Sequence, residues 1–189
     1  MKKVLSVILA LTMALSLAAC GGNSAKETTA PEAPATAVEI LDKVWAEYAE
    51  SEKFAIIGGN VEAGIMDTPA NYDMEYAENM TYNLLVPAEQ IANVAEAASM
   101  IHMMNANTFT CGVFRLAEGV STADFAAAMQ QAVQGNMWMC GFPEQLLIKD
   151  VSGQYVLVAF GLTDVMTTFE KHLNEVYPEA ATLYSEPIA

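Results

Sequence analysis

The amino-acid sequence predicts an α+β fold whose core is a ferredoxin-like β-α-β-β-α-β unit at residues 107–186, with N-terminal helices packed against it. The order of the apolar patterns predicts this unit, because segments typical of strands alternate in that order with segments of helical period. The distribution of charge agrees. The first and third strands are central in this topology and carry only Arg115, whereas the second and fourth, its edges, carry Lys149, Asp150 and Glu186.

The N-terminal part of the domain is predicted to begin with a helix at residues 37–50. Thr36 and Glu39 form a capping-box pattern, and large apolar side chains follow at helical spacing. Residues 60–79 show no clear period and are predicted to be loops. The next two segments are predicted to be a short strand at 81–86 and a helix at 88–104.

Most elements of the core have a local signal for where they begin or end. Ser121 begins a helix with Asp124 in the position of the capping-box carboxylate, and Gly135 ends it. Ser152 and Gly153 form a tight turn between two apolar strands. The predicted order is a strand at 107–116, a helix from Ser121 to Gly135, strands at 145–151 and 155–160, a helix from Thr163 to Tyr177, and a strand at 181–185.

The helices at 37–50 and 88–104 have a structural role in this prediction. Right-handed crossovers would place both helices of the ferredoxin-like core on one face of its sheet. The two N-terminal helices would then cover the other face. Residues 37–189 are therefore predicted to form a single α+β domain.

Residues 1–19 have the layout of a secretory signal peptide, with Lys2 and Lys3 followed by an uncharged apolar run and small residues. With Leu17 three positions before Cys20, the segment resembles the lipobox of bacterial lipoproteins. The resemblance implies a diacylglycerol on Cys20 that anchors the protein in the lipid bilayer, on the extracytoplasmic side of the cell membrane. The alternative is an ordinary signal peptide with a cysteine nearby.

The segment at residues 20–36 contains almost no large apolar side chain, which predicts a disordered tether after the lipidated cysteine. The chain of 189 residues carries 23 acidic and 8 basic residues, a formal net charge of −15. So acidic a chain is not expected to bind nucleic acid, which requires neutralisation of phosphates by basic side chains. The charge also favours a position away from an anionic bilayer.

The C-terminal part, at about residues 95–185, resembles an uncharacterised lipoprotein family of Gram-positive anaerobes, catalogued as domain of unknown function 4358. The matching stretches are the lipobox, the strand at 110–115, the Gly-Phe-Pro-Glu-Gln segment at 141–145 and the strand at 153–159. The resemblance implies a similar fold and no established activity. Similar lipoproteins sometimes carry a bacteriocin-transport-accessory label.

Cysteine, methionine and histidine side chains suggest two further sites. Cys111 and Cys140 are either a disulfide or two buried thiols. Thioether, thiolate and imidazole ligands together select Cu(I), and the predicted fold brings residues 104–107 and 137–143 to the same end of the sheet. The alternative is that methionine fills gaps in the core. The candidate soft-metal ligands are Met100, His102, Met104, Met139 and Cys140.

Other polar segments carry weaker signals. No catalytic or phosphate-binding motif occurs, and no cofactor is expected. Asp67, Asp73, Glu75 and Glu78 lack the spacing of a calcium loop and are predicted to be a solvated loop. The segment of Phe142, Pro143, Glu144 and Gln145 is either an interaction loop or the turn that directs the following strand.

The sequence therefore favours a membrane-anchored extracytoplasmic lipoprotein that acts as a non-enzymatic binding module for an envelope protein or a small ligand. One alternative is an accessory subunit of an export or transport system. A soft-metal carrier or an enzyme is the other.

Overall fold

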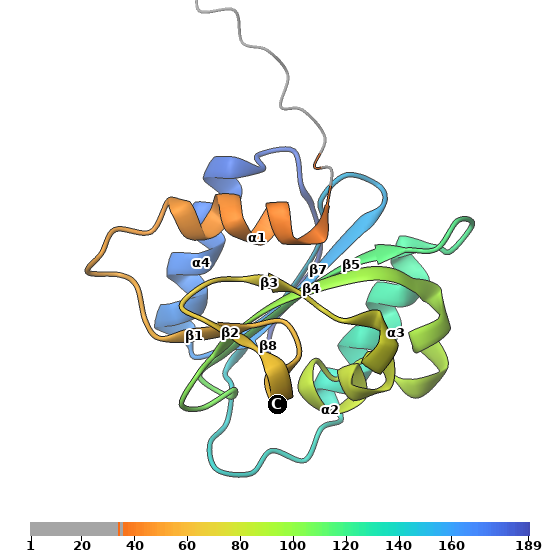
Figure 1. Ribbon diagram of the computed structural model, residues 1–189, viewed down its shortest axis with the longest axis horizontal. Helices are drawn as coiled ribbons and strands as arrows, with labels where there is room; N and C mark the ends of the chain where they lie inside the picture. The colour runs from red at the N-terminus through yellow and green to blue at the C-terminus, as the bar shows by residue number, and fades with distance from the viewer. Residues whose placement is uncertain (1–33, 35) are drawn as a thin grey trace, which may run out of the picture. The chain divides into compact units, whose positions relative to one another are not determined.

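An eight-stranded antiparallel sheet runs through the residues that the computed structural model describes, which are 34 and 36–189 (Figure 1). Its strands lie in the order β2 (Ile65–Met66), β1 (Ile56–Gly58), β4 (Val94–His102), β5 (Phe109–Leu116), β7 (Tyr155–Gly161), β6 (Gln145–Asp150) and β8 (Ala181–Pro187), and β3 (Ala70–Asn71) pairs with β4. The helices are α1 (Ala37–Ala46), α2 (Met80–Asn83), α3 (Thr122–Gln134) and α4 (Thr163–Val176), with 3-10 turns η1 (Val61–Ala63), η2 (Met74–Asn79) and η3 (Ala88–Asn93). The fold is thus mixed α and β, as predicted.

Local capping signals place the helices α1 and α3. The Thr36 hydroxyl accepts a hydrogen bond from the Glu39 amide at the beginning of α1, and the Ser121 hydroxyl accepts one from the Asp124 amide at the beginning of α3. Gly135 ends α3. These two helices are confirmed, as are the predicted strands β5, β6, β7 and β8 and the helix α4.

The helix predicted at 88–104 is wrong. Residues 88–93 form the 3-10 turn η3, and residues 94–102 form the strand β4, which pairs with β5 along its length. Its residues from Ala97 to Ile101 are all buried, since both faces of the sheet are covered, and a strand buried on both faces shows no alternation. The strand predicted at 81–86 is wrong as well, because α2 forms a single helical turn there.

The presence of β4 changes the order of the strands. A ferredoxin-like sheet would pair the last strand with the first one of the core, β8 with β5. In the structure β4 occupies that side of β5, and β8 pairs with β6 at the opposite edge. The chain order β-α-β-β-α-β is present at residues 109–187, but the sheet order is not ferredoxin-like.

This strand order also explains why α3 and α4 cover opposite faces of the sheet (Figure 1). Each helix connects two parallel strands that are separated by one strand, and both connections step toward β8. Because β5 and β7 run in opposite directions, right-handed crossovers place the two helices on opposite faces. The prediction of both core helices on one face is therefore wrong.

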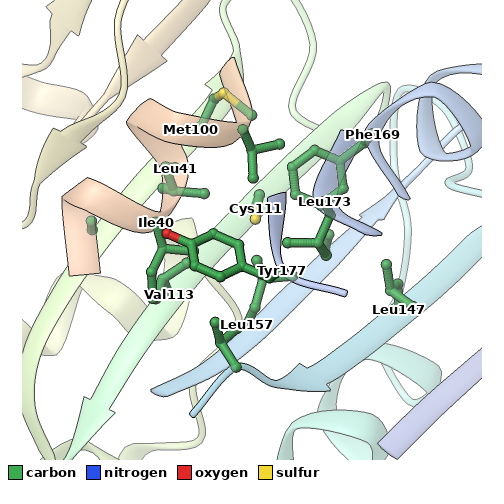
Figure 2. Packing of buried hydrophobic residues seen from close by; sticks show 14 of the residues in the cluster. Ile40, Leu41, Met100, Cys111, Val113, Leu147, Leu157, Phe169, Leu173 and Tyr177 are labelled. Atoms are coloured by element: carbon green, nitrogen blue, oxygen red, sulfur yellow. The ribbon is translucent and has the colours of Figure 1, made fainter. Parts of the chain in front are cut away.

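Two apolar clusters fill the spaces between the sheet and its helices. One lies beneath α1 and α4 and includes Ile40, Cys111 and Phe169 (Figure 2). The other lies beneath α2 and α3 and includes Met80, Phe114 and Phe125. Residues 36–189 belong to one compact unit and bury both clusters within it, so this part of the chain has what independent folding requires.

Charged residues in β6 and β4 have structural roles. β6 is an interior strand, and Lys149 is buried there with its ammonium donating a hydrogen bond to Asn174 Oδ1 (2.7 Å). The expectation that Lys149 and Asp150 protect an edge is therefore wrong, whereas β8, which carries Glu186, is an edge strand as predicted. On β4, the Glu96 carboxylate accepts hydrogen bonds from Arg115 Nε (2.8 Å) and from the Ala37 amide (2.6 Å), which ties the beginning of α1 to the sheet.

Cys20 and the predicted signal peptide and tether lie outside the described residues. Among the described helices, none is both long enough and apolar enough to cross a bilayer.

Candidate functional site

Two connections that are far apart in the sequence are held together at one end of the sheet. The turn between β4 and β5, residues 103–108, lies against the connection from α3 to β6, residues 135–144 (Figure 1). Asn105 Nδ2 donates a hydrogen bond to the Cys140 carbonyl (3.1 Å), and Asn107 Nδ2 donates to the carbonyls of Met139 (2.8 Å) and Gly141 (3.0 Å). The predicted approach of these two segments is confirmed.

These hydrogen bonds hold an unusual backbone conformation. Cys140 has φ = 63° and Gly141 has φ = 134°, in the left-handed half of the φ range. A non-glycine residue in that region is strained by about 1–3 kcal/mol, so it persists only where its surroundings fix it. Next to it, the Trp138 ring packs on Phe160, with the centroids 5.4 Å apart. The connection is therefore anchored at several points.

Although its backbone is anchored, this end of the molecule exposes large apolar side chains. Met137 and Met139, on either side of Trp138, are 90% and 79% exposed, and Phe142 is 71% exposed. The methionine face is our name for the exposed apolar side chains on these two connections and on the segments that line the neighbouring hollow or pair with them: Val61, Met66, Tyr82, Met103, Met104, Met137, Met139 and Phe142. Single exposed apolar residues are ordinary, but a gathering of them at one place usually marks an interaction site.

A hollow of about 210 Å³ lies within the methionine face. Val61, Tyr82, Met103 and Met104 line it, and Asn105, which binds the neighbouring connection, lines it as well. Ile57 also lines the hollow, and the exposed Met66 lies opposite Ile57 in the pairing of β1 with β2. The turn at 103–108, α2 and the segment around η1 thus contribute to one surface.

His102 lies in this hollow but is not presented as a metal ligand. Its Nδ1 accepts hydrogen bonds from the amides of Met104 (3.3 Å) and Asn105 (3.2 Å), and its ring stacks on Phe54 with the centroids 5.4 Å apart. With Nδ1 accepting, the proton of the neutral ring is on Nε2, and neither nitrogen then has a lone pair free for a metal.

The other soft-metal candidates do not share one environment. Met100 is fully buried beneath α1, opposite Cys111 in the pairing of β4 with β5 (Figure 2). Met104, Met139 and Cys140 are exposed. Among the described residues, no three histidine, cysteine or acidic side chains gather closely enough to hold a metal ion.

The two described cysteines are both free thiols. Cys111 lies in the core between the sheet and α1, and burial raises the pKa of its thiol well above the ordinary value. Cys140 is exposed on the anchored connection. Of the two readings of these cysteines, the disulfide is therefore not formed, and that of two buried thiols holds only for Cys111.

The segment from Phe142 to Gln145 has features of both roles considered for it, an interaction loop and a turn that directs the following strand. Phe142 is exposed in the methionine face, whereas Pro143 is buried and Gln145 begins β6. The Glu144 carboxylate accepts hydrogen bonds from the hydroxyl (2.6 Å) and the amide (2.9 Å) of Thr163 at the beginning of α4. These bonds lower the pKa of Glu144. The three residues after Phe142 thus direct β6 and cap α4.

A second hollow, of about 350 Å³, lies beside the methionine face, and we call it the acidic hollow because two carboxylates are among its lining residues. Its lining includes Glu62, Asp73 and the half-exposed Tyr76. Asn60 also lines it, and its side-chain oxygen accepts a hydrogen bond from the Asp73 amide (2.6 Å). Most of the predicted solvated loop is the 3-10 turn η2, where the Asp73 carboxylate accepts a hydrogen bond from the Glu75 amide. The four carboxylates of that segment are exposed, as expected for solvated side chains.

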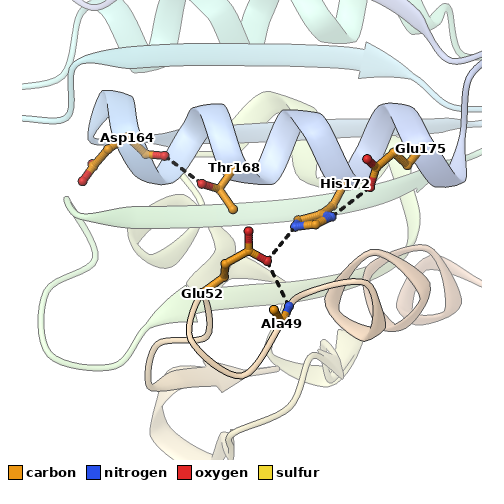
Figure 3. A network of polar contacts seen from close by, with 6 residues as sticks. All are labelled: Ala49, Glu52, Asp164, Thr168, His172 and Glu175. Carbon is orange, nitrogen blue, oxygen red and sulfur yellow. Dashed lines mark hydrogen bonds and ion pairs between the residues drawn. The ribbon is translucent and has the colours of Figure 1, made fainter.

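A polar network that the sequence did not reveal lies on α4. Buried His172 has one carboxylate at each ring nitrogen: Glu175 Oε2 is 3.1 Å from Nδ1, and Glu52 Oε2 is 3.2 Å from Nε2 (Figure 3). The Ala49 amide donates a hydrogen bond to the same Glu52 oxygen (2.9 Å). Because carboxylates occupy both ring nitrogens, the histidine ties the 49–53 turn to α4 and does not activate a nucleophile. Glu175 is three residues from His172, but Glu52 is 120 residues away, and no local signal predicts that pair.

Comparisons with family models, curated proteins and solved structures found no match for this chain. The resemblance to the uncharacterised lipoprotein family stays a prediction.

The Glu52 contacts predict a pH-dependent contribution to stability. The Ala49 amide first, and then His172, lower the pKa of Glu52 below its ordinary 4.5. A carboxyl with a lowered pKa in the folded state stabilises the fold above its ordinary pKa, and this contribution is lost as the pH falls through its lowered value. We expect Glu52→Gln to be less stable than the wild type at about pH 7, with the difference shrinking as the pH falls below the ordinary pKa of 4.5.

Urea unfolding of both proteins at several pH values measures this difference. Glu179→Gln, which changes an exposed carboxylate at the opposite end of the sheet, serves as the control. A difference between Glu52→Gln and the wild type that stays constant with pH would contradict the assignment.

The environments of the two thiols predict unequal reactivity. In the native protein Cys140 should react with a thiol reagent, and Cys111 should react on the order of 100-fold more slowly, because it becomes accessible only when the core opens. Mass spectrometry of proteolytic peptides measures labelling at each position, and both thiols should react in denaturant. Protection of both thiols until a reductant is added would instead show a disulfide.

Proposed function

We propose that the protein is a lipid-anchored extracytoplasmic binding module that engages an envelope partner through the methionine face. The observation that carries the proposal is the anchored backbone beneath exposed methionines. Hydrogen bonds from Asn105 and Asn107 hold the connection that presents Met137, Met139 and Phe142.

The physical argument for binding is the combination of a fixed backbone with adaptable side chains. A fixed backbone reduces the entropy that is lost when a partner binds. Methionine side chains are unbranched and polarizable, so they fit partner surfaces of varied shape, which is why methionine is frequent at binding surfaces. A face of this kind that served no partner would leave apolar area exposed without benefit to the fold.

The support for a lipid anchor comes from the sequence alone. The lipobox resemblance supports lipid attachment at Cys20, which lies outside the described residues. Two acyl chains give stable membrane attachment, whereas one gives only marginal binding. A module held at the membrane in this way would meet partners of the cell envelope at a high local concentration.

Site-specific photo-crosslinking in intact cells tests the proposal. A photoreactive amino acid at position 104 or 139, both exposed in the methionine face, should give a discrete crosslinked species. The same amino acid at Glu179, exposed at the opposite end of the sheet, should not give that species.

Cys20→Ser is the control for the anchor. It removes the lipid acceptor, so the protein should leave the membrane fraction and lose the crosslinked species. Equal crosslinking from positions 104, 139 and 179, or none from any of them, would contradict binding through the methionine face.

A further inference from the structure

The segment that forms the methionine face is almost free of positive charge. Residues 54–148 contain ten acidic residues and one basic residue, Arg115. Arg115 is paired with Glu96, with Nε 2.8 Å from the carboxylate oxygen. Apart from Glu96, the acidic residues between β1 and β5 lie in the segments that connect these strands, and among the described residues none of them forms an ion pair with a basic side chain.

Apolar and acidic surfaces adjoin at η1. Val61 lines the hollow of the methionine face, while its neighbours Glu62 and Ala63 line the acidic hollow. The acidic hollow also contains Asp73, and the exposed Glu78 follows on η2. A ligand that covered the methionines would thus have carboxylates at its side.

Charge excludes several occupants of this surface. A second copy of the chain would bring together two molecules that each carry a formal net charge of −15, and like charges at an interface oppose association. An acidic protein or an anionic bilayer is repelled for the same reason. Residues 54–148 therefore favour an occupant with positive charge and an apolar side.

We infer that the methionine face binds a cationic amphipathic segment of a partner protein. Its apolar side lies on Met104, Met139 and Phe142, and its lysine or arginine side chains face the carboxylates of Glu62, Asp73 and Glu78. This inference rests on the proposed function and specifies the chemistry of its partner.

Two forces that respond differently to salt produce this binding. Contact between apolar side chains and the methionines contributes affinity that changes little with salt. Attraction between the acidic surface and the basic side chains steers association and weakens as the ionic strength rises. Binding should therefore depend on both the charge of the segment and the arrangement of its apolar side chains.

A titration with synthetic peptides tests the inference. The protein is the chain from Gly21 onward, which includes the unit that buries both apolar clusters. The probe is a helical peptide of about 18 leucine and lysine residues with all leucines on one side. One control peptide has the same composition in scrambled order, and another has glutamate in place of lysine.

Isothermal titration calorimetry should show saturable binding of one amphipathic Leu/Lys peptide per chain. The scrambled peptide should bind about tenfold more weakly, and the Leu/Glu peptide should not bind. The affinity should fall as salt is raised from about 0.05 M to about 0.5 M. Equal affinity for the amphipathic and scrambled peptides would overturn the inference, because the protein would then bind peptides by their charge alone, whatever the arrangement of their leucines.

Variants locate the binding surface. Met104→Gln combined with Met139→Gln should weaken binding of the amphipathic peptide about tenfold, since both side chains are exposed and neither supports the fold. Glu62→Gln should weaken binding about threefold, whereas the matched Glu179→Gln at the opposite end of the sheet should leave it unchanged. Circular dichroism checks that each variant is folded. Unchanged binding by the methionine variant would overturn the inference.

The outcomes separate this inference from the proposed function. If the Leu/Lys peptide fails to bind but positions 104 and 139 still crosslink in cells, the partner has a different chemistry and only this inference is overturned. Self-association of the purified chain that Met139→Gln abolishes would also overturn it, because the occupant would then be a second copy.

Discussion

The pairing of β4 with β5 is the constraint on which the rest of the structure depends. β4 occupies the side of β5 where a ferredoxin-like sheet would place its last strand, so β8 lies at the opposite edge beside β6. Both helical crossovers then step in the same direction, which places α3 and α4 on opposite faces. Because both faces are covered, the central strands are buried along their length.

The same pairing assembles the methionine face. The turn that joins β4 to β5 carries Asn105 and Asn107. Their side-chain amide groups donate hydrogen bonds to three backbone carbonyls of the connection between α3 and β6. Hydrogen bonds of this kind each contribute roughly 1 kcal/mol, which is comparable to the strain of a left-handed conformation at Cys140. The fold thus maintains a strained connection whose methionines are exposed, and this arrangement is the basis of the proposed binding function.

Local signals predicted the elements whose ends or periods are encoded nearby. Thr36 and Ser121 cap helices, and β5, β6 and β7 are apolar runs with clear boundaries. The error at β4 has a physical cause: a strand of alanine, serine and methionine that is buried on both faces has neither alternation nor β-branched enrichment over most of its length. The strand order and the contact between His172 and Glu52 could not be predicted from local signals, because they join residues that are far apart in the sequence. The approach of the two methionine-bearing segments was predicted, and the burial of Met100 agrees with the alternative that methionine fills gaps in the core. The hydrogen bonds to His102 Nδ1 were not predicted.

The strand order can be measured directly by nuclear magnetic resonance on the chain from Gly21 onward. Cross-strand nuclear Overhauser effects between backbone protons report which strands are neighbours. The observed strand order predicts contacts between Ala98 and Val113 and between Ile148 and Tyr184, which are paired in the structure. Contacts between residues 181–187 and residues 109–116, with none from 94–102 to 109–116, would show the ferredoxin-like order and contradict the pairing of β4 with β5.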